Sequence, residues 1–160
     1  MIHARDEDFG DIIAIFKKYK EWLGHIRHDY VQQMIMNNAK KFNFISTLTS
    51  KHKGTSLLIF ERDVALSYSV YKVNRKIGTA SAKKGDCILH QICAKNRDGS
   101  ASDVLQRFFK YINKKVYLSV RKDNTEAIDF YLKNDMLEIG DIAWKNNTIP
   151  GKIFLYNATT

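Results

Sequence analysis

The chain has 160 residues and a mass of 18.6 kDa; 44% of the residues are hydrophobic and 27% are charged. This composition can form a hydrophobic core, and it excludes a wholly disordered or fibrous chain. Two cysteines and one proline exclude a disulfide scaffold and a Pro-rich linker, and no His/Cys spacing fits a metal site. The apolar runs are too short to cross a membrane, and the polar, acidic N-terminus is unlike a signal peptide. These features predict a soluble, cytoplasmic, single domain over residues 1–160 that holds no metal.

Positive charge is concentrated in the middle third of the sequence. The formal net charge is +9 at pH 7; residues 1–40 contribute 0, residues 41–100 contribute +7 and residues 101–160 contribute +2. A basic stretch of this kind attracts polyanions such as nucleic acid, acidic proteins or a phosphorylated cofactor. A lysine-rich solvated surface explains the same excess, so charge alone leaves the partner open. The basic side chains lie around Lys72, Arg75, Lys76, Lys83 and Lys84.

Hydrophobic periodicity predicts two helices at the start of the chain, over residues 8–20 and near residues 28–40. The apolar face expected for the first helix consists of Phe9, Ile12, Ile13, Phe16 and Tyr19. From Phe42 the period changes to two, which predicts strands. Residues 41–49 form the first expected strand, residues 54–78 form two strands with a turn near 61–63, and residues 86–94 form a short buried strand. Residues 74–85 are expected to be a basic loop.

The C-terminal half alternates between the two periods. A helix is predicted over residues 100–113, with Ser100 or Ser102 as its N-cap. The elements expected after it are a strand at 114–123, a helix at 124–134, and strands at 137–146 and 151–157 joined by a turn at 146–151. The resulting order, ααββββαβαββ, favours an α/β (α+β) fold with a mixed sheet between helical layers.

The strand–loop–helix unit over residues 88–109 is the most specific segment. Its turn is rich in small residues from Gly99 to Ser102, which let an anion approach the backbone N–H groups at the positive end of the following helix. The turn is not a P-loop, because the GxxxxGK[ST] lysine is missing, and with one glycine it is not a GxGxxG fingerprint. Taken alone, such a turn is more often a simple helix start than a ligand site.

Together with residues 116–140, this unit resembles the GCN5-related N-acetyltransferase (GNAT) family. The family's pyrophosphate loop reads Arg/Gln-x-x-Gly-x-Gly/Ala, which Asn96-x-x-Gly99-x-Ala101 matches except for Asn at the first position. Alternatively, Arg97 fills that position in a loop shorter by one residue. The family's second motif is matched by a strand at 116–120 and by Asn124, Ala127, Phe130 and Tyr131, with Asn134 and Met136 in place of the usual Gly and Phe. The likeness is close over about residues 84–145, and the order of elements agrees along the whole chain.

The resemblance implies a central mixed, mostly antiparallel sheet flanked by helices, in which two strands splay apart to hold acetyl-CoA or another acyl-CoA. Main-chain groups around Ile92 and Cys93 would bond the pantetheine arm, and backbone N–H groups of residues 98–102 would hold the pyrophosphate. The implied cofactor-binding residues are Ile92, Cys93, Arg97, Asp98, Gly99, Ser100, Ala101, Ser102, Asn124 and Tyr131.

In the family, an amine attacks the thioester directly, with a base for the ammonium proton and an acid for the leaving thiolate. Tyr131 matches the family's usual acid. The alternative is a structural tyrosine whose ring is packed and whose hydroxyl is exposed to water. For the base, the strand before the loop offers Asp86 and His90, four residues apart and on one face with Ile88 and Ile92. A hydrogen-bonded core histidine and a water chain are the alternatives. Cys93 lacks an activating neighbour and is expected to be a small buried hydrophobe.

The acceptor of a family member usually lies over the loop between the first two helices and over strand ends. Here that implies a substrate-binding set of His25, Arg27, Asp29, Tyr30 and Trp144. Arg27 suits a carboxylate or phosphate and Asp29 an ammonium, but the two residues fit a surface ion pair equally well.

Two classes of function follow from these residues. The first is an acyl-CoA-dependent N-acyltransferase whose amine acceptor is unknown. The alternative is a non-catalytic or nucleic-acid-directed GNAT-like protein that modifies nucleobases or binds through its basic surface. Dimers are common in the family, so the resemblance also suggests a homodimer.

Overall fold

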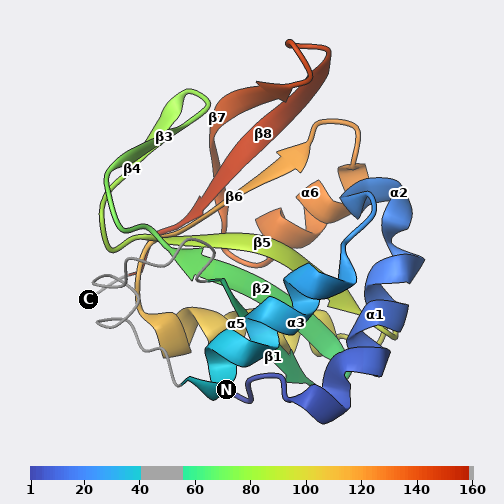
Figure 1. The fold of residues 1–160 in the computed structure, drawn as a ribbon. Coiled ribbons are helices and arrows are strands. Elements are labelled where there is room, and N and C mark those ends of the chain that lie inside the picture. The colour runs from blue at the N-terminus through green and yellow to red at the C-terminus, as the bar shows by residue number, and fades with distance from the viewer. Residues whose placement is uncertain (41–55, 159–160) are drawn as a thin grey trace.

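A computed structural model describes residues 1–40 and 56–158 of the protein (Figure 1). The N-terminal helical elements are η1 (Asp6–Asp8), α1 (Phe9–Lys18), α2 (Lys20–Leu23) and α3 (His28–Ala39). The strands that follow are β1 (Leu57–Glu61), β2 (Val64–Val70), β3 (Arg75–Ile77), β4 (Ala80–Ala82) and β5 (Cys87–Ala94). The C-terminal elements are α5 (Ser100–Ile112), β6 (Val116–Arg121), α6 (Thr125–Lys133), β7 (Leu137–Trp144) and β8 (Ile149–Tyr156). The strand expected over residues 41–49 lies outside the described residues.

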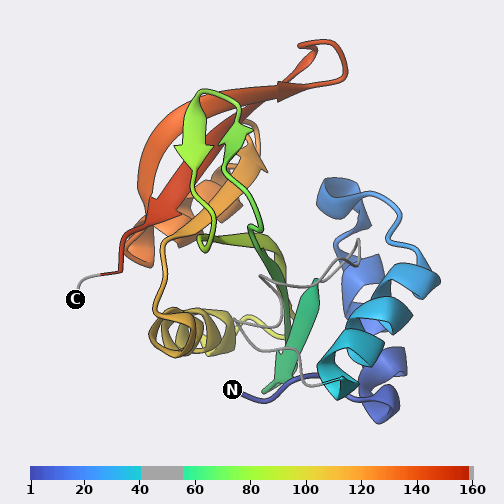
Figure 2. The same cartoon turned by 60° about the vertical axis from the view of Figure 1, so that its left-hand side comes forward.

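Six of the strands form one sheet in the order β1-β2-β5-β6-β8-β7. Every neighbouring pair in it is antiparallel except β5 and β6, which run parallel. Helices α1 and α3 cover one face of its N-terminal half, and α5 covers the other, which Figure 2 shows with this half of the sheet seen nearly edge-on. The predicted mixed, mostly antiparallel sheet between helical layers is therefore confirmed.

Two hydrophobic cores hold these layers together. The larger core lies between the sheet and helices α5 and α6, around Leu66, Phe108 and Phe154. The smaller core joins α1 and α3 to the other face, where the buried side chains of α1 are Ile12, Ile15 and Phe16. The apolar face predicted for the first helix is confirmed, since all five of its residues contribute to this core, but the prediction omitted Ile15. Tyr19 contributes from just beyond the last residue of α1.

The basic loop expected over residues 74–85 is instead a hairpin, formed by β3 and β4 with Arg75 opposite Ala82 and Ile77 opposite Ala80. The hairpin folds back onto β7, where the Thr79 N–H donates to the Asp141 carbonyl and the Asp141 N–H donates to Thr79 Oγ1, both at 2.9 Å. Gly78 makes this approach possible, because a Cβ there would lie 2.1 Å from the Asp141 carbonyl oxygen. Its φ of +55° also favours glycine.

Two predicted boundaries also differ from the structure. Neither Ser100 nor Ser102 caps α5: the N-cap is Gly99, whose φ of +87° lies in the left-handed region. Strand β8 begins at Ile149, so the final turn is shorter than the predicted 146–151. At α6, by contrast, the Asn124 side chain is the N-cap and accepts a hydrogen bond from the Ala127 N–H at 3.3 Å.

Candidate functional site

The parallel strands β5 and β6 are paired only at their first residues, Cys87 with Val116 and Ile88 with Tyr117. Farther along, β5 is paired with β2 and β6 with β8, and the two strands run apart, as Figure 1 shows. This divergence defines a wedge, the space between β5 and β6 beyond Ile88 and Tyr117. Ile92 and Cys93 lie on the diverging part of β5, where the edge of the strand can bond an extended ligand through its main chain.

The N-terminus of α5 lies at the end of β5, next to the open end of the wedge. Its first intrahelical hydrogen bond runs from the Asp103 N–H to the Gly99 carbonyl at 3.2 Å. The N–H groups of residues 100–102 therefore have no partner within the helix, which favours an anion at this position. A Cβ added at Gly99 would meet no atom within 4 Å, so the space above the glycine is open.

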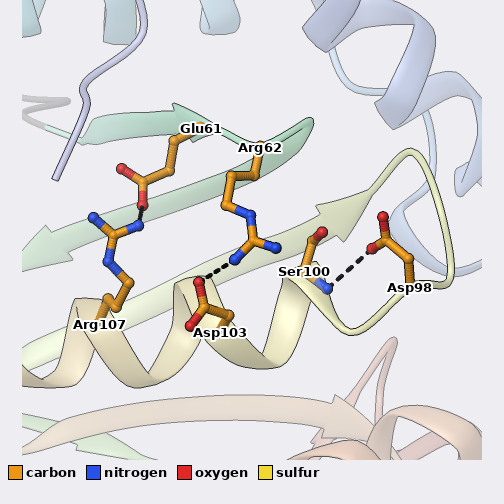
Figure 3. Close-up of polar contacts among 6 residues, drawn as sticks. All are labelled: Glu61, Arg62, Asp98, Ser100, Asp103 and Arg107. Carbon is orange, nitrogen blue, oxygen red and sulfur yellow. Dashed lines mark hydrogen bonds and ion pairs between the residues drawn. The ribbon is translucent and has the colours of Figure 1, made fainter.

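One anion of the chain itself lies at this helix end. The Asp98 carboxylate accepts a hydrogen bond from the Ser100 N–H at 3.0 Å (Figure 3). Hydrogen bonds from the side chain and backbone of Ser100 lower the pKa of Asp98. The turn thus has the polarity expected for a phosphate site, but Asp98 shares it.

The two departures from the family's second motif have structural partners. Asn134 is 3% exposed, and its Nδ2 donates to Ser102 Oγ at 3.2 Å and to the Phe130 carbonyl at 2.8 Å. Gln106 of α5 donates to Asn134 Oδ1 at 3.2 Å, so Asn134 joins the two helices. Met136 is buried in the larger core. Both replacements stabilise the packing of α6 and leave the turn at Gly99 open.

Tyr131, the predicted acid, lies on α6 beside the wedge. Its ring centroid is 6.1 Å from that of Phe154 on β8, while the Cys93 thiol on β5 is near enough to raise the pKa of the phenol. Burial is the larger cause of the raised pKa, so the phenol is protonated at neutral pH. Burial also raises the pKa of the Cys93 thiol, to about 12, which fits the expectation of an inert, buried cysteine.

His90 lies at a β-bulge. Gln91 pairs with Ser67 and Leu89 pairs with Tyr68, so His90 is one extra residue between two successive pairs. The bulge reverses the alternation of side chains after it: Leu89 and Ile92 both pack on the α5 side of the sheet, and Cys93 packs on the α1 side. The prediction that Ile92 shares a face with Asp86 and His90 was therefore wrong.

The His90 ring lies in a polar setting on the α3-facing side of the sheet. Its Nε2 is 2.7 Å from Ser69 Oγ, which in turn is 2.7 Å from Ser56 Oγ. The ring reaches solvent, yet enough protein surrounds it that burial lowers the pKa of His90 below 6.5. His90 is therefore neutral and able to accept a proton at pH 7.

Asp86, the other predicted base, has a different environment. It precedes β5, and its carboxylate accepts a hydrogen bond from the Lys83 N–H at 2.8 Å within a turn. This turn lies at the closed end of the wedge, where β5 and β6 are still paired. Among the described contacts, none joins Asp86 to the polar side chains around His90.

The residues predicted to bind the acceptor are not gathered in one place. Arg27 and Asp29 form an ion pair of 2.7 Å, with both side chains largely exposed, and His25 is exposed. Tyr30 is half-buried; burial raises the pKa of its phenol, and the nearby Ser56 and Ser67 side chains oppose that shift. Trp144 packs against Gly151, where a Cβ would lie 2.5 Å from the indole ring.

Two contacts reach the β6–α6 side of the wedge, one from α2 and one from the loop after β5. The Arg121 guanidinium at the end of β6 lies 5.5 Å from the ring centroid of Trp22 on α2. Arg97, in the loop before α5, forms an ion pair of 2.7 Å with Glu126 in the first turn of α6. Beside the first contact is a pocket of about 300 Å³, lined by Arg121, Lys122, Asp123, Thr148, Ile149 and Pro150.

Sequence reasoning missed the serines around His90. Ser67 and Ser69 occupy alternate positions in the otherwise apolar segment 64–70, which was the one available signal. Among residues 1–40 and 56–158, no group of three or more His, Cys, Asp or Glu side chains is arranged to hold a metal ion. No helix in these residues is long and apolar enough to cross a membrane.

No protein-family model matches the sequence, and no curated protein matches it at a significant level. Solved structures do match over nearly the whole length. A GNAT-family acetyltransferase from Bacillus cereus has a TM-score of 0.64 and 17% identity, and the alignment covers 99% of this chain and 96% of that one. A ribosomal-protein-alanine N-acetyltransferase from Brucella melitensis has a TM-score of 0.66 and 14% identity, covering 97% of each chain.

A third match is NAA60 from Arabidopsis thaliana, solved in complex with acetyl-CoA, with a TM-score of 0.62 and 12% identity; the alignment covers 97% of this chain and 96% of that one. Identities this low establish the fold and nothing finer. The fold of this chain is that of the GNAT acetyltransferases.

Proposed function

We propose that the protein is an acyl-CoA-dependent N-acyltransferase, with acetyl-CoA as the expected donor. The observation that carries this proposal is the wedge between β5 and β6, which ends at a helix N-terminus that favours anions. Acetyl-CoA is also the ligand of one structural neighbour, NAA60. We further propose that residues 1–160 form one domain, since one six-stranded sheet includes both the first strand, β1, and the last, β8.

Acyl-CoA supplies a thioester that an amine can attack. In this proposal the main chain at Ile92 and Cys93 binds the pantetheine arm, and N–H groups of residues 99–102 bind the pyrophosphate. The Asp98 carboxylate must then move aside or share the turn. Arg97 is near enough to contribute positive charge once its pairing with Glu126 opens.

The proposed acid and base have the required protonation states. His90 is neutral at pH 7, because burial lowers its pKa, and accepts a proton from the acceptor ammonium. Tyr131 retains its proton at neutral pH, because burial raises its pKa, and donates to the leaving thiolate. We place His90 ahead of Asp86 as the base, because the Asp86 carboxylate is occupied in a turn.

Protein N-termini are the first acceptors to screen, because one neighbour is a ribosomal-protein-alanine N-acetyltransferase. Small amines and polyamines form the second group. Turnover is measured as release of free CoA thiol.

The test of the cofactor site is isothermal titration with acetyl-CoA, CoA and dephospho-CoA. Binding that is lost in a Gly99→Leu variant supports the proposal, because the side chain would fill the open space over the turn. Gly24→Leu is the matched control: Gly24 also has a positive φ, +71°, and no atom within 4 Å of an added Cβ, but it lies between α2 and α3. Flat heats and no thermal shift with any of the three ligands would refute the proposal.

A second candidate, a nucleic-acid-directed GNAT-like protein, is favoured by the position of the basic hairpin. Arg75, Lys76, Lys83 and Lys84 are exposed, and they lie at the start of β5, whereas the turn at Gly99 follows its end (Figure 1). Eight residues of strand separate the two by roughly 23 Å. The charge of the hairpin is therefore too distant to neutralise phosphates bound at Gly99, and it is left for another polyanion.

This second candidate predicts binding of a labelled RNA or DNA oligonucleotide that weakens steeply with salt. Lys83→Glu combined with Lys84→Glu should abolish it, whereas Lys17→Glu combined with Lys20→Glu, on the helices at the other side of the molecule, should not. Equal effects of both double variants would refute a hairpin-specific site.

A further inference from the structure

Four polar side chains form a hydrogen-bonded chain that begins at His90 and crosses the sheet toward α3. His90 Nε2 lies 2.7 Å from Ser69 Oγ on β2. Ser69 Oγ lies 2.7 Å from Ser56 Oγ, just before β1. Ser56 lies near enough to the Tyr30 phenol on α3 to act on its pKa. The four residues come from four segments of the chain, so their alignment is a property of the tertiary fold.

These hydrogen-bonded side chains take the place of apolar packing on this face of the sheet. Next to it, Leu58, Ala65 and Cys93 pack against α1 and α3. Buried hydroxyl groups are costly unless they are hydrogen-bonded, and here each hydroxyl has a partner in the next. The β-bulge adds to the arrangement, because the extra residue directs the His90 ring toward Ser69.

We propose that Ser69, Ser56 and Tyr30 are a proton relay that carries away the proton His90 takes from the acceptor amine. This inference rests on the proposed N-acyltransferase function. In the tautomer that fits the contacts, Nε2–H donates to Ser69, Ser69 donates to Ser56, and Ser56 donates to Tyr30. Nδ1 is then the unprotonated nitrogen, and it faces away from the relay.

The transfer balances in protons and charge. Nδ1 accepts one proton from the ammonium, and the Nε2 proton moves to Ser69 Oγ. Ser69 passes its own proton to Ser56, Ser56 passes its proton to Tyr30, and Tyr30, which is half-buried, releases one to water. His90 is left neutral with its proton on Nδ1, and reversal of the hydroxyl orientations restores the first tautomer. No residue of the relay acquires a lasting charge in a buried position.

The groups that face His90 are consistent with this role. Ser69 contacts it from β2, Tyr30 approaches through Ser56 from α3, and Gln91 next to it accepts a hydrogen bond from Ser67. Burial lowers its pKa, and no charged group among the described residues contributes to that shift. Because no described carboxylate stabilises an imidazolium here, a route for the proton to leave is of direct use.

The test compares Ser69→Ala with Ser81→Ala in the full-length protein. Ser81 lies on β4 with an exposed side chain, and no described contact joins that side chain to His90, Ser56 or Tyr30. We expect Ser69→Ala to lower kcat about tenfold or more with KM for acetyl-CoA unchanged, as loss of assisted proton transfer does. Ser69→Thr should restore most of the rate, and Ser81→Ala should behave like wild type. A Ser69→Ala rate equal to that of Ser81→Ala would overturn the relay.

A second measurement needs no substrate. ¹⁵N NMR of the imidazole should show the proton of neutral His90 on Nε2, and Ser69→Ala should shift that equilibrium toward the Nδ1–H tautomer. A wild-type protein with the proton on Nδ1 would contradict the relay as written. If wild type binds acetyl-CoA but turns over no amine, the proposed function fails; if it is active and Ser69→Ala is too, only the relay fails.

Discussion

The ion pair between Glu61 and Arg107 allows a sharp prediction about stability, because its two partners differ in exposure. Figure 3 shows the contact between the two side chains. The Glu61 side chain is 2% exposed, whereas that of Arg107 is 49% exposed. Glu61 has one further donor, the Ile2 N–H at 2.9 Å. Arg107→Met would therefore leave a buried carboxylate with a single hydrogen bond.

Removing one partner of a buried ion pair costs about 3–5 kcal/mol. Because water can reach the half-exposed side of Arg107, we expect the lower end, about 3 kcal/mol. For a chain of this length that lowers Tm by roughly 6–12 °C. The assay is urea unfolding followed by far-UV circular dichroism, with thermal melts in parallel.

Arg62→Met is the matched control. Arg62 pairs with Asp103, which lies one turn of α5 away from Arg107. Both side chains of this pair are about half exposed. An exposed pair of this kind contributes up to about 1 kcal/mol. Adding Glu61→Gln to Arg107→Met should recover part of the loss, because it removes the unpaired charge. Equal losses for Arg107→Met and Arg62→Met would refute the reasoning.

Three further predictions concern the hairpin, the acid and pH. Gly78→Ala should lower the free energy of unfolding by about 2–4 kcal/mol in a urea titration, because the added Cβ would displace two hydrogen bonds to β7 and strain a positive φ; Gly10→Ala, with open space in α1, should not. Tyr131→Phe should lower kcat about 10- to 100-fold, with acetyl-CoA binding retained in calorimetry; an unchanged kcat would exclude Tyr131 as the acid. Burial lowers the pKa of His3 and of His90 in the folded protein, so the unfolded chain binds protons more readily. The free energy of unfolding should therefore decrease as the pH falls below about 6.5, and His3→Gln combined with His90→Gln should reduce that dependence in urea titrations at pH 7.5 and 5.5.

The long periodic segments of the fold were predictable from the sequence, since burial of one face imposes a pattern of apolar residues. Helix α5 and the β6–α6 unit show this, and the match to the second GNAT motif depends on the same residues. The β3–β4 hairpin was not predictable in this way, because Ile77 and Ala82 are its only buried side chains. The sequence of such short strands, with so few apolar residues, has the same pattern as that of a loop.

The environment of His90 was beyond sequence reasoning for a different reason. A β-bulge is a relation between two strands, and nothing in residues 86–94 alone indicates that Gln91 rather than His90 pairs with Ser67. The serines that contact His90 come from two other segments, so only the tertiary fold brings them together. Asp86 and His90 also have different environments, and this difference depends on the hydrogen bond from the Lys83 N–H to the Asp86 carboxylate.

The short pairing of β5 with β6 has a mechanical consequence for the whole sheet. Strands β1, β2 and β5 form one antiparallel half, strands β6, β8 and β7 form the other, and two residue pairs join the halves. The β3–β4 hairpin belongs to the first half in sequence, yet it is bonded to β7 of the second half through Thr79 and Asp141. The residue pairs lie at the start of β5, whereas Asp141 is level with Val120 near the end of β6, because both pair with Lys152 of β8. Rotation of one half against the other about those residue pairs would therefore have to carry the hairpin along with β7 or break its two hydrogen bonds, so the hairpin restrains the width of the wedge.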